Sequence, residues 1–207
     1  MMIGTHHARR TQPLSEISVP KPSAATLYWL AAALLFLALA LPWWRISMVA
    51  PQYPFGLHVT TWFFGVNGDV KEVDELNHYI GFMPLAAIAA FERHVAFAAG
   101  PLALLLLAAA AAVRSRIGGL LAIPAITLPV VFVADLAAWL RYAGHHLDPH
   151  AALSGAVMPW TPVLFGAGGV GQFHTQSVFE PGFYLALLAA IVAVAAMVAR
   201  TKEPRAA

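Results

Sequence analysis

Histidines form the densest group of potential metal ligands in this sequence. His145, His146 and His150 stand within six residues of one another, together with Asp148. Imidazole is a natural ligand for copper and zinc, and a neighbouring carboxylate can orient the ring. The spacing follows no zinc-finger or metalloprotease motif, so a polar loop with incidental histidines explains the cluster equally well.

Another histidine, His78, stands in a run of acidic and aromatic residues. The chain has no cysteine, which excludes disulfides, thiolate metal sites and a cysteine nucleophile. Histidine and methionine remain as ligands, and both suit copper. The candidate metal ligands are His78, Met83, His145, His146 and Met158. The alternative for His78 and Asn77 is that they satisfy backbone groups in a compact loop.

Asp135 is a carboxylate inside an apolar stretch. Inserting such a charge into a bilayer costs about 2.5–3.5 kcal/mol, so the side chain should face protein or water. Helical spacing places Asp135, Trp139, Tyr142 and His146 on one stripe. The stripe is compatible with a proton path, part of a metal shell or a quinol-binding face. A structural hydrogen bond or ion pair is the alternative.

The elements that would position these residues are membrane helices. Of the 207 residues, 60% are hydrophobic and only 11% are charged, against about half and about a quarter in soluble domains. Four stretches are apolar enough to cross a bilayer: 26–42, 95–113, 117–140 and 182–199. The sequence predicts an all-α membrane protein, a four-helix bundle with long outer loops at 43–94 and 142–181. The tails 1–25 and 200–207 are predicted to be disordered.

Positive charge predicts the orientation. Eight of the twelve Lys and Arg residues lie in the two tails and in the short link at 114–116, which flank the predicted spans. The positive-inside rule therefore predicts that both termini lie in the cytoplasm and both long loops on the outer face, which would be the periplasm for a bacterial inner-membrane protein. The weak net charge of +2 is then a sign of topology, and we expect no nucleic-acid partner. Ala38–Ala40 resembles a signal-peptidase site, but we interpret the first span as a retained anchor.

Within the first loop, His58–Phe64 is rich in strand-forming residues, and Asn67-Gly68-Asp69 is a favoured hairpin turn. A small β-hairpin is therefore expected there. In the second loop, 166–171 matches the dinucleotide fingerprint by letters but lies in no βαβ unit, so we interpret it as a flexible loop. No nucleotide is expected, and no haem either, because the predicted spans contain no histidine.

Three segments of the loops are similar to a family of small bacterial membrane proteins: Trp44–Leu57, Leu76–Gly81 and Gly144–Pro149. Genes of that family stand beside those for clade II nitrous oxide reductase and its copper-maturation factors. The similarity covers roughly 43–83 and 142–181. Family members often carry Met after the Ile-Gly pair, whereas this chain has Phe82 and then Met83.

The resemblance implies an accessory protein or subunit of a periplasmic copper enzyme, without catalytic activity of its own. Its outer loops would bind copper, or dock the enzyme or a copper chaperone. The candidate docking residues are Tyr53, Trp62, Asn77, Tyr79 and Asp148. One alternative is a membrane anchor subunit of a redox complex that takes electrons from quinol. A transporter is a further alternative, which would require an oligomer because four spans without a visible repeat are too few alone.

Overall fold

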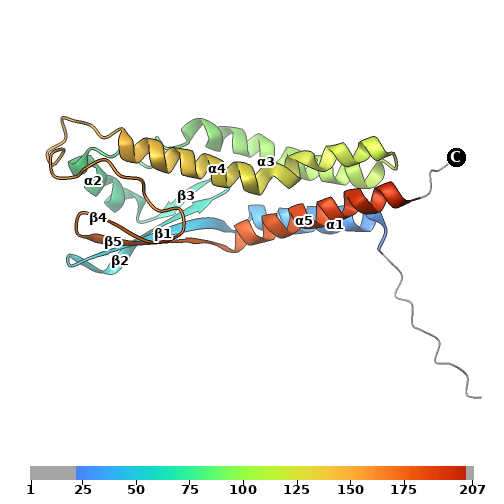
Figure 1. Cartoon of the computed structure of the whole chain (residues 1–207), viewed down its shortest axis with the longest axis horizontal. Helices are drawn as coiled ribbons and strands as arrows, with labels where there is room; N and C mark the ends of the chain where they lie inside the picture. The colour runs from blue at the N-terminus through green and yellow to red at the C-terminus, as the bar shows by residue number, and fades with distance from the viewer. Residues whose placement is uncertain (1–21, 204–207) are drawn as a thin grey trace, which may run out of the picture.

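Five α-helices and one five-stranded antiparallel sheet make up residues 22–203, the part of the chain that the computed structural model describes (Figure 1). The predicted all-α bundle is therefore wrong, because both long loops contribute strands to the same sheet. The elements in order are α1 (Ala24–Leu39), β1 (Pro42–Ala50), β2 (Tyr53–Trp62), β3 (Gly65–Gly68), α2 (Val70–Ile80), α3 (Ala90–Ala112), the 3₁₀ helix η1 (Arg116–Ala122), α4 (Ile123–His145), β4 (Gly166–Val170), β5 (Phe173–Phe179) and α5 (Pro181–Lys202).

The central strands of the sheet continue the helices. The strand order is β3-β2-β1-β5-β4, and Ile46 of β1 pairs with Val59 of β2 and with Ser177 of β5. β1 follows α1 almost directly, and β5 leads straight into α5, so the strand pair and the helix pair form one elongated unit. At the junction the Glu180 amide donates to the Trp43 carbonyl at 2.9 Å. This joint fixes the sheet at one end of the helices.

The expected hairpin exists, but its turn lies elsewhere. The chain reverses at Phe63 and Phe64, and Asn67 and Gly68 belong to β3, opposite Thr60 and Val59. Both phenylalanines pack against the helical part of the molecule: the Phe63 ring lies 5.1 Å from that of Trp43, and the Phe64 ring lies 5.2 Å from that of Phe97 in α3. Burial of two aromatic rings thus outweighs the local preference of the Asn-Gly pair for a turn.

The prediction of a flexible loop at 166–171 is also wrong. Gly166–Val170 forms the edge strand β4, which pairs with β5 in the register Gly168 to Thr175. Glycine is depleted in strands, so a sequence pattern does not reveal such an edge strand. Val163 lies so close to Gly168 that a Cβ there would meet its side chain at 2.8 Å.

Three helices are long and apolar enough to cross a membrane: Ala90–Ala112, Ile117–His145 and Pro181–Lys202. These correspond to the predicted second, third and fourth spans. The predicted first span, 26–42, is shorter than expected, because α1 ends at Leu39 and Pro42 already begins β1. α1 is apolar and packs along α5.

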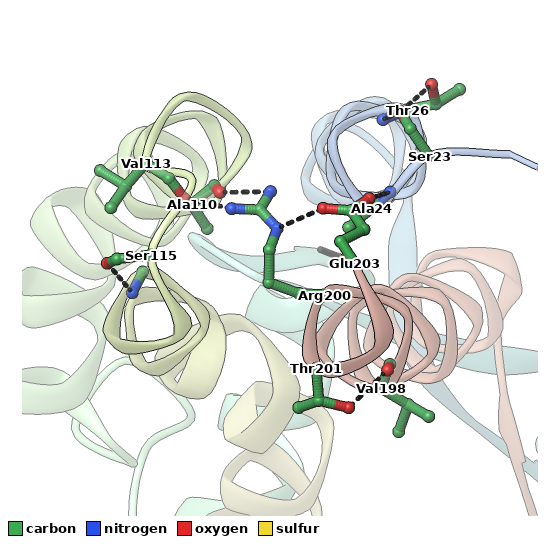
Figure 2. A network of polar contacts seen from close by, with 11 residues as sticks. Ser23, Ala24, Thr26, Ala110, Val113, Ser115, Val198, Arg200, Thr201 and Glu203 are labelled. Carbon is green, nitrogen blue, oxygen red and sulfur yellow. Dashed lines mark hydrogen bonds and ion pairs between the residues drawn. The ribbon is translucent and has the colours of Figure 1, made fainter. Parts of the chain in front are cut away.

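Arg200 holds together the end of the helices that lies away from the sheet (Figure 2). Its guanidinium donates to the carbonyl groups of Ala110, at 3.2 Å, and of Val113, at the carboxyl end of α3. Its Nε forms an ion pair with Glu203 at 3.5 Å, and the other oxygen of Glu203 accepts the amide of Ala24 at the start of α1. A cation at a helix C-terminus and an anion at a helix N-terminus both complement the helix dipole. We call these two side chains the terminal clasp.

Candidate ligand-binding cavity

The helices leave a space between α3 and α4. α1 and α5 pack along each other, α3 packs against α1, and α4 packs against α5. α3 and α4 make little contact directly and are joined through η1 at the end away from the sheet. Figure 1 shows both helices on one side of the sheet, with α4 reaching farther along it. The two helices and the sheet thus face each other across a gap.

A cavity of about 810 Å³ occupies the space between the sheet, α2, α3 and α4. This volume lies within the range of small-molecule sites, roughly 300–1,000 Å³. The face of the sheet that lines it is mainly apolar: Trp44, Ile46, Met48, Val59, Thr61 and Thr175. Phe63 and Phe132, which both contact Trp43, lie at its base near the helix pair.

Two carboxylates line this cavity, Glu92 from the first turn of α3 and Asp135 from α4. Within residues 22–203 neither carboxylate forms an ion pair with a basic side chain. One carboxylate oxygen of Glu92 is buried without a hydrogen-bond partner in the same described range. An acceptor in this position is costly unless a donor meets it, so a ligand that donates hydrogen bonds fits the site.

Arg93, the next residue after Glu92, also lines the cavity, but its guanidinium binds backbone carbonyl groups. Its guanidinium donates to the carbonyl of Leu85 at 3.1 Å and to that of Ala86, in the turn before α3. Asn77 of α2 also lines the cavity, and its side-chain amide nitrogen is buried without a partner among the described residues. Besides Arg93, the site therefore presents two acceptor carboxylates and one free amide donor in a mainly apolar lining.

A cover forms part of the wall of the cavity. It consists of residues 146–165, and it is fastened by backbone contacts at two glycines. The Asp148 amide donates to the Gly81 carbonyl at 2.8 Å, and the Trp160 amide donates to the Gly144 carbonyl at 3.1 Å. The Trp160 ring packs against Phe82 at 5.4 Å. These contacts lie within two of the segments that carry the family resemblance, so the structure gives their glycines a packing role.

The predicted stripe on α4 is divided between two environments. Asp135 and Trp139 line the cavity. Tyr142 and His146 are exposed and stack on each other, with ring centres 4.0 Å apart. His146 also contacts the Tyr142 carbonyl through Nδ1 at 2.8 Å. Only the first half of the stripe therefore belongs to the cavity.

The candidate metal ligands lie at separate places. His78 is exposed on α2, and Met83 is half-buried in the following loop. His145 contacts Thr161 at 3.5 Å, and Met158 is largely exposed in the cover. Among residues 22–203 no three His, Asp or Glu side chains come together as a metal site would require. The copper site stays a prediction.

The candidate docking residues fall into two groups. Trp62, Asn77 and Tyr79 line the cavity. Asp148 accepts the amide of His150 within the cover, at 2.9 Å. Tyr53 donates to Glu72 at 2.5 Å and thereby ties β2 to α2. This hydrogen bond raises the pKa of the Tyr53 hydroxyl above its ordinary value of 10.0.

The Tyr53 contact predicts a pH dependence. Because the pKa is raised in the folded state, the neutral phenol contributes stability below pH 10, and this contribution is lost as the pH rises through the raised pKa. We expect Tyr53→Phe to flatten the fall of the thermal midpoint at alkaline pH, measured in detergent from about pH 9 to about pH 11. Tyr79→Phe, at an exposed tyrosine, is the control. Equal pH profiles for Tyr53→Phe and the unaltered protein would refute the prediction.

Glu92 is the residue of the cavity that sequence reasoning missed, because it was assigned to the first loop. A carboxylate within one turn of an apolar span was the available signal.

Comparison with known proteins adds no further assignment: the chain matches no known protein family, no curated protein and no solved structure.

Proposed function

We propose that this protein is a membrane-anchored subunit that binds a quinol-type molecule, with an apolar tail and a dihydroxylated ring, in the cavity between the sheet and the helices. The observation that carries the proposal is the placement of Glu92 and Asp135 in one mainly apolar cavity, where neither carboxylate forms an ion pair within residues 22–203. A quinol ring is neutral and has two hydroxyl donors, which match two carboxylate acceptors. The aromatic lining supplies flat apolar contact surface for the ring.

The position of the carboxylates along the helices agrees with this proposal. Asp135 lies 18 residues beyond Ile117, the start of the third candidate span, or about 30 Å with a rise of about 2.0 Å per residue in η1 and about 1.5 Å in α4. A hydrocarbon core is about 30 Å thick. The polar ring would thus sit near the membrane surface, where the head of an amphiphile resides, and the tail would remain at the depth of the spans.

In this proposal α1 crosses the membrane together with α5, and the sheet stands on the periplasmic side. The basic end of the helices, with Arg200 and Lys202, would face the cytoplasm. In this proposal, electrons from quinol pass to a redox centre on a partner. A periplasmic copper enzyme remains the predicted partner, on the sequence resemblance alone.

Substitution of Asp135 by asparagine tests the proposal. We expect Asp135→Asn to weaken the binding of a short-chain quinol about tenfold, because a charge-assisted hydrogen bond is replaced by a neutral one. Binding is measured in mild detergent under argon by quenching of tryptophan fluorescence, since Trp44, Trp62, Trp139 and Trp160 line the cavity.

Glu75→Gln is the matched control, since Glu75 is exposed on α2 and does not line the cavity. This variant should bind like the unaltered protein. If the unaltered protein does not quench with quinol, or if Asp135→Asn and Glu75→Gln bind equally well, the proposed site is wrong.

A further inference from the structure

The cavity reaches the surface between α3 and α4, on helices that are apolar enough to span a membrane. Val95 of α3 and Val131 of α4 line the cavity and are also 45% and 58% exposed. Phe91, one turn before Val95, lines it as well and is exposed. Apolar side chains that border a cavity and are exposed on spanning helices face lipid rather than water. We call the gap between Val95 and Val131 the lateral mouth.

The packing around the mouth leaves this gap open. α3 is held by α1 and by the turn at Phe63 and Phe64, whereas α4 is held by α5. The direct contact between α3 and α4 is slight compared with the contact that each makes with α1 or α5. The base of the cavity is closed by Phe132 and Phe63, which pack on Trp43.

The cavity has a second boundary at the opposite end of the sheet. Gln52 and Gln172, in the turns between strands, line it there and are exposed. A ligand that came from water would use this end. A long-chain amphiphile is concentrated in the bilayer, since leaving it exposes its apolar chain to water.

We infer that the ligand enters sideways from the bilayer through the lateral mouth, and that its apolar tail remains between α3 and α4 while its head contacts Asp135 and Glu92. This inference rests on the proposed function and specifies the source of the ligand. The ligand is then drawn from the quinol dissolved in the membrane rather than from the water phase.

Blocking the mouth with a bulky side chain tests the inference. Val131→Trp would fill the gap, and we expect it to slow the loading of a long-chain quinol from nanodiscs about tenfold. Val194→Trp is the matched control, because Val194 is an exposed residue of α5 that does not line the cavity. Gln172→Trp obstructs the far end instead and should leave the loading rate unchanged.

Short-chain quinol in detergent separates this inference from the proposed function, because detergent solution has no bilayer to cross. If the unaltered protein fails to bind short-chain quinol, the proposed function and the inference are both wrong. If it binds, and Gln172→Trp slows loading from nanodiscs while Val131→Trp does not, only lateral access is wrong. Slower loading in Val131→Trp with unchanged affinity for the short-chain quinol supports the inference.

Discussion

Replacing Gly144 by alanine is expected to destabilise the protein by about 3 kcal/mol, the upper end of the usual cost of overpacking. A Cβ at this position would lie 1.8 Å from the carbonyl oxygen of Trp160. Backbone rather than a flexible side chain is in the way, so the cover must move off α4. The hydrogen bond from the Trp160 amide and the contact of its ring with Phe82 would be lost together.

Ligand binding should fall with stability in this variant, because Trp160 lines the cavity. The measurements are denaturant unfolding in mixed micelles and quinol-dependent fluorescence quenching. Gly155→Ala is a matched control within the same cover: nothing lies within 4 Å of a Cβ at that position, and its φ is not positive. A Gly144→Ala protein as stable as Gly155→Ala would show that the cover is not docked on α4.

Gly81 offers an independent check of the cover from its other attachment. A Cβ there would lie 2.5 Å from the Asp148 carbonyl oxygen, and the φ of +76° disfavours any other residue. Gly81→Ala should therefore resemble Gly144→Ala. If only one of the two variants is destabilised, the glycine of the other variant does not hold the cover.

Loss of the terminal clasp is the second large effect. We expect Arg200→Ala to lower the free energy of unfolding by about 3 kcal/mol, because charged hydrogen bonds to two carbonyl groups of α3 disappear and Glu203 loses its partner. The side chain of Arg200 is only 3% exposed, so water does not replace these bonds easily. The guanidinium carbon also lies 5.4 Å from the centre of the Tyr28 ring, which adds a cation–π contact.

Arg200→Met removes the charge and the hydrogen-bond donors but keeps a long, unbranched side chain. It therefore separates the loss of charge from the loss of volume. It should recover little of the lost stability if the hydrogen bonds matter. Lys202→Ala, at an exposed basic residue of the same helix end, is the control and should change stability by less than about 0.5 kcal/mol. Near-equal unfolding of Arg200→Ala and Lys202→Ala would contradict the role of the clasp.

The membrane helices were largely predictable, because a long apolar run has few alternatives to a helix in lipid. The spans predicted at 95–113, 117–140 and 182–199 correspond to α3, to η1 with α4, and to α5. The strand tendency of 58–64 was also visible, since β-branched and aromatic residues favour strands. Both signals are local, and each depends only on residues close in sequence.

The sheet itself was not predictable from local pattern. β1 and β5 pair although Ile46 and Ser177 are far apart in the chain, and β4 has glycine where a strand pattern would need side chains. The same long-range pairing turns the helix-flanking segments into the floor of a cavity. Apart from one small hairpin, the loops were therefore predicted to be irregular, whereas their strands form a five-stranded sheet.

The sequence by itself determined that the chain carries lipid-compatible helices, that it lacks thiol chemistry, and that Asp135 needs a polar or protein environment. Only the tertiary structure decided that Asp135 shares a cavity with Glu92, that Tyr142 and His146 lie outside it, and that no three possible metal ligands among residues 22–203 come together. The physical reason is that hydrophobic run length and residue type act locally, whereas a cavity exists only where strands and helices distant in the chain pack together and leave space between them.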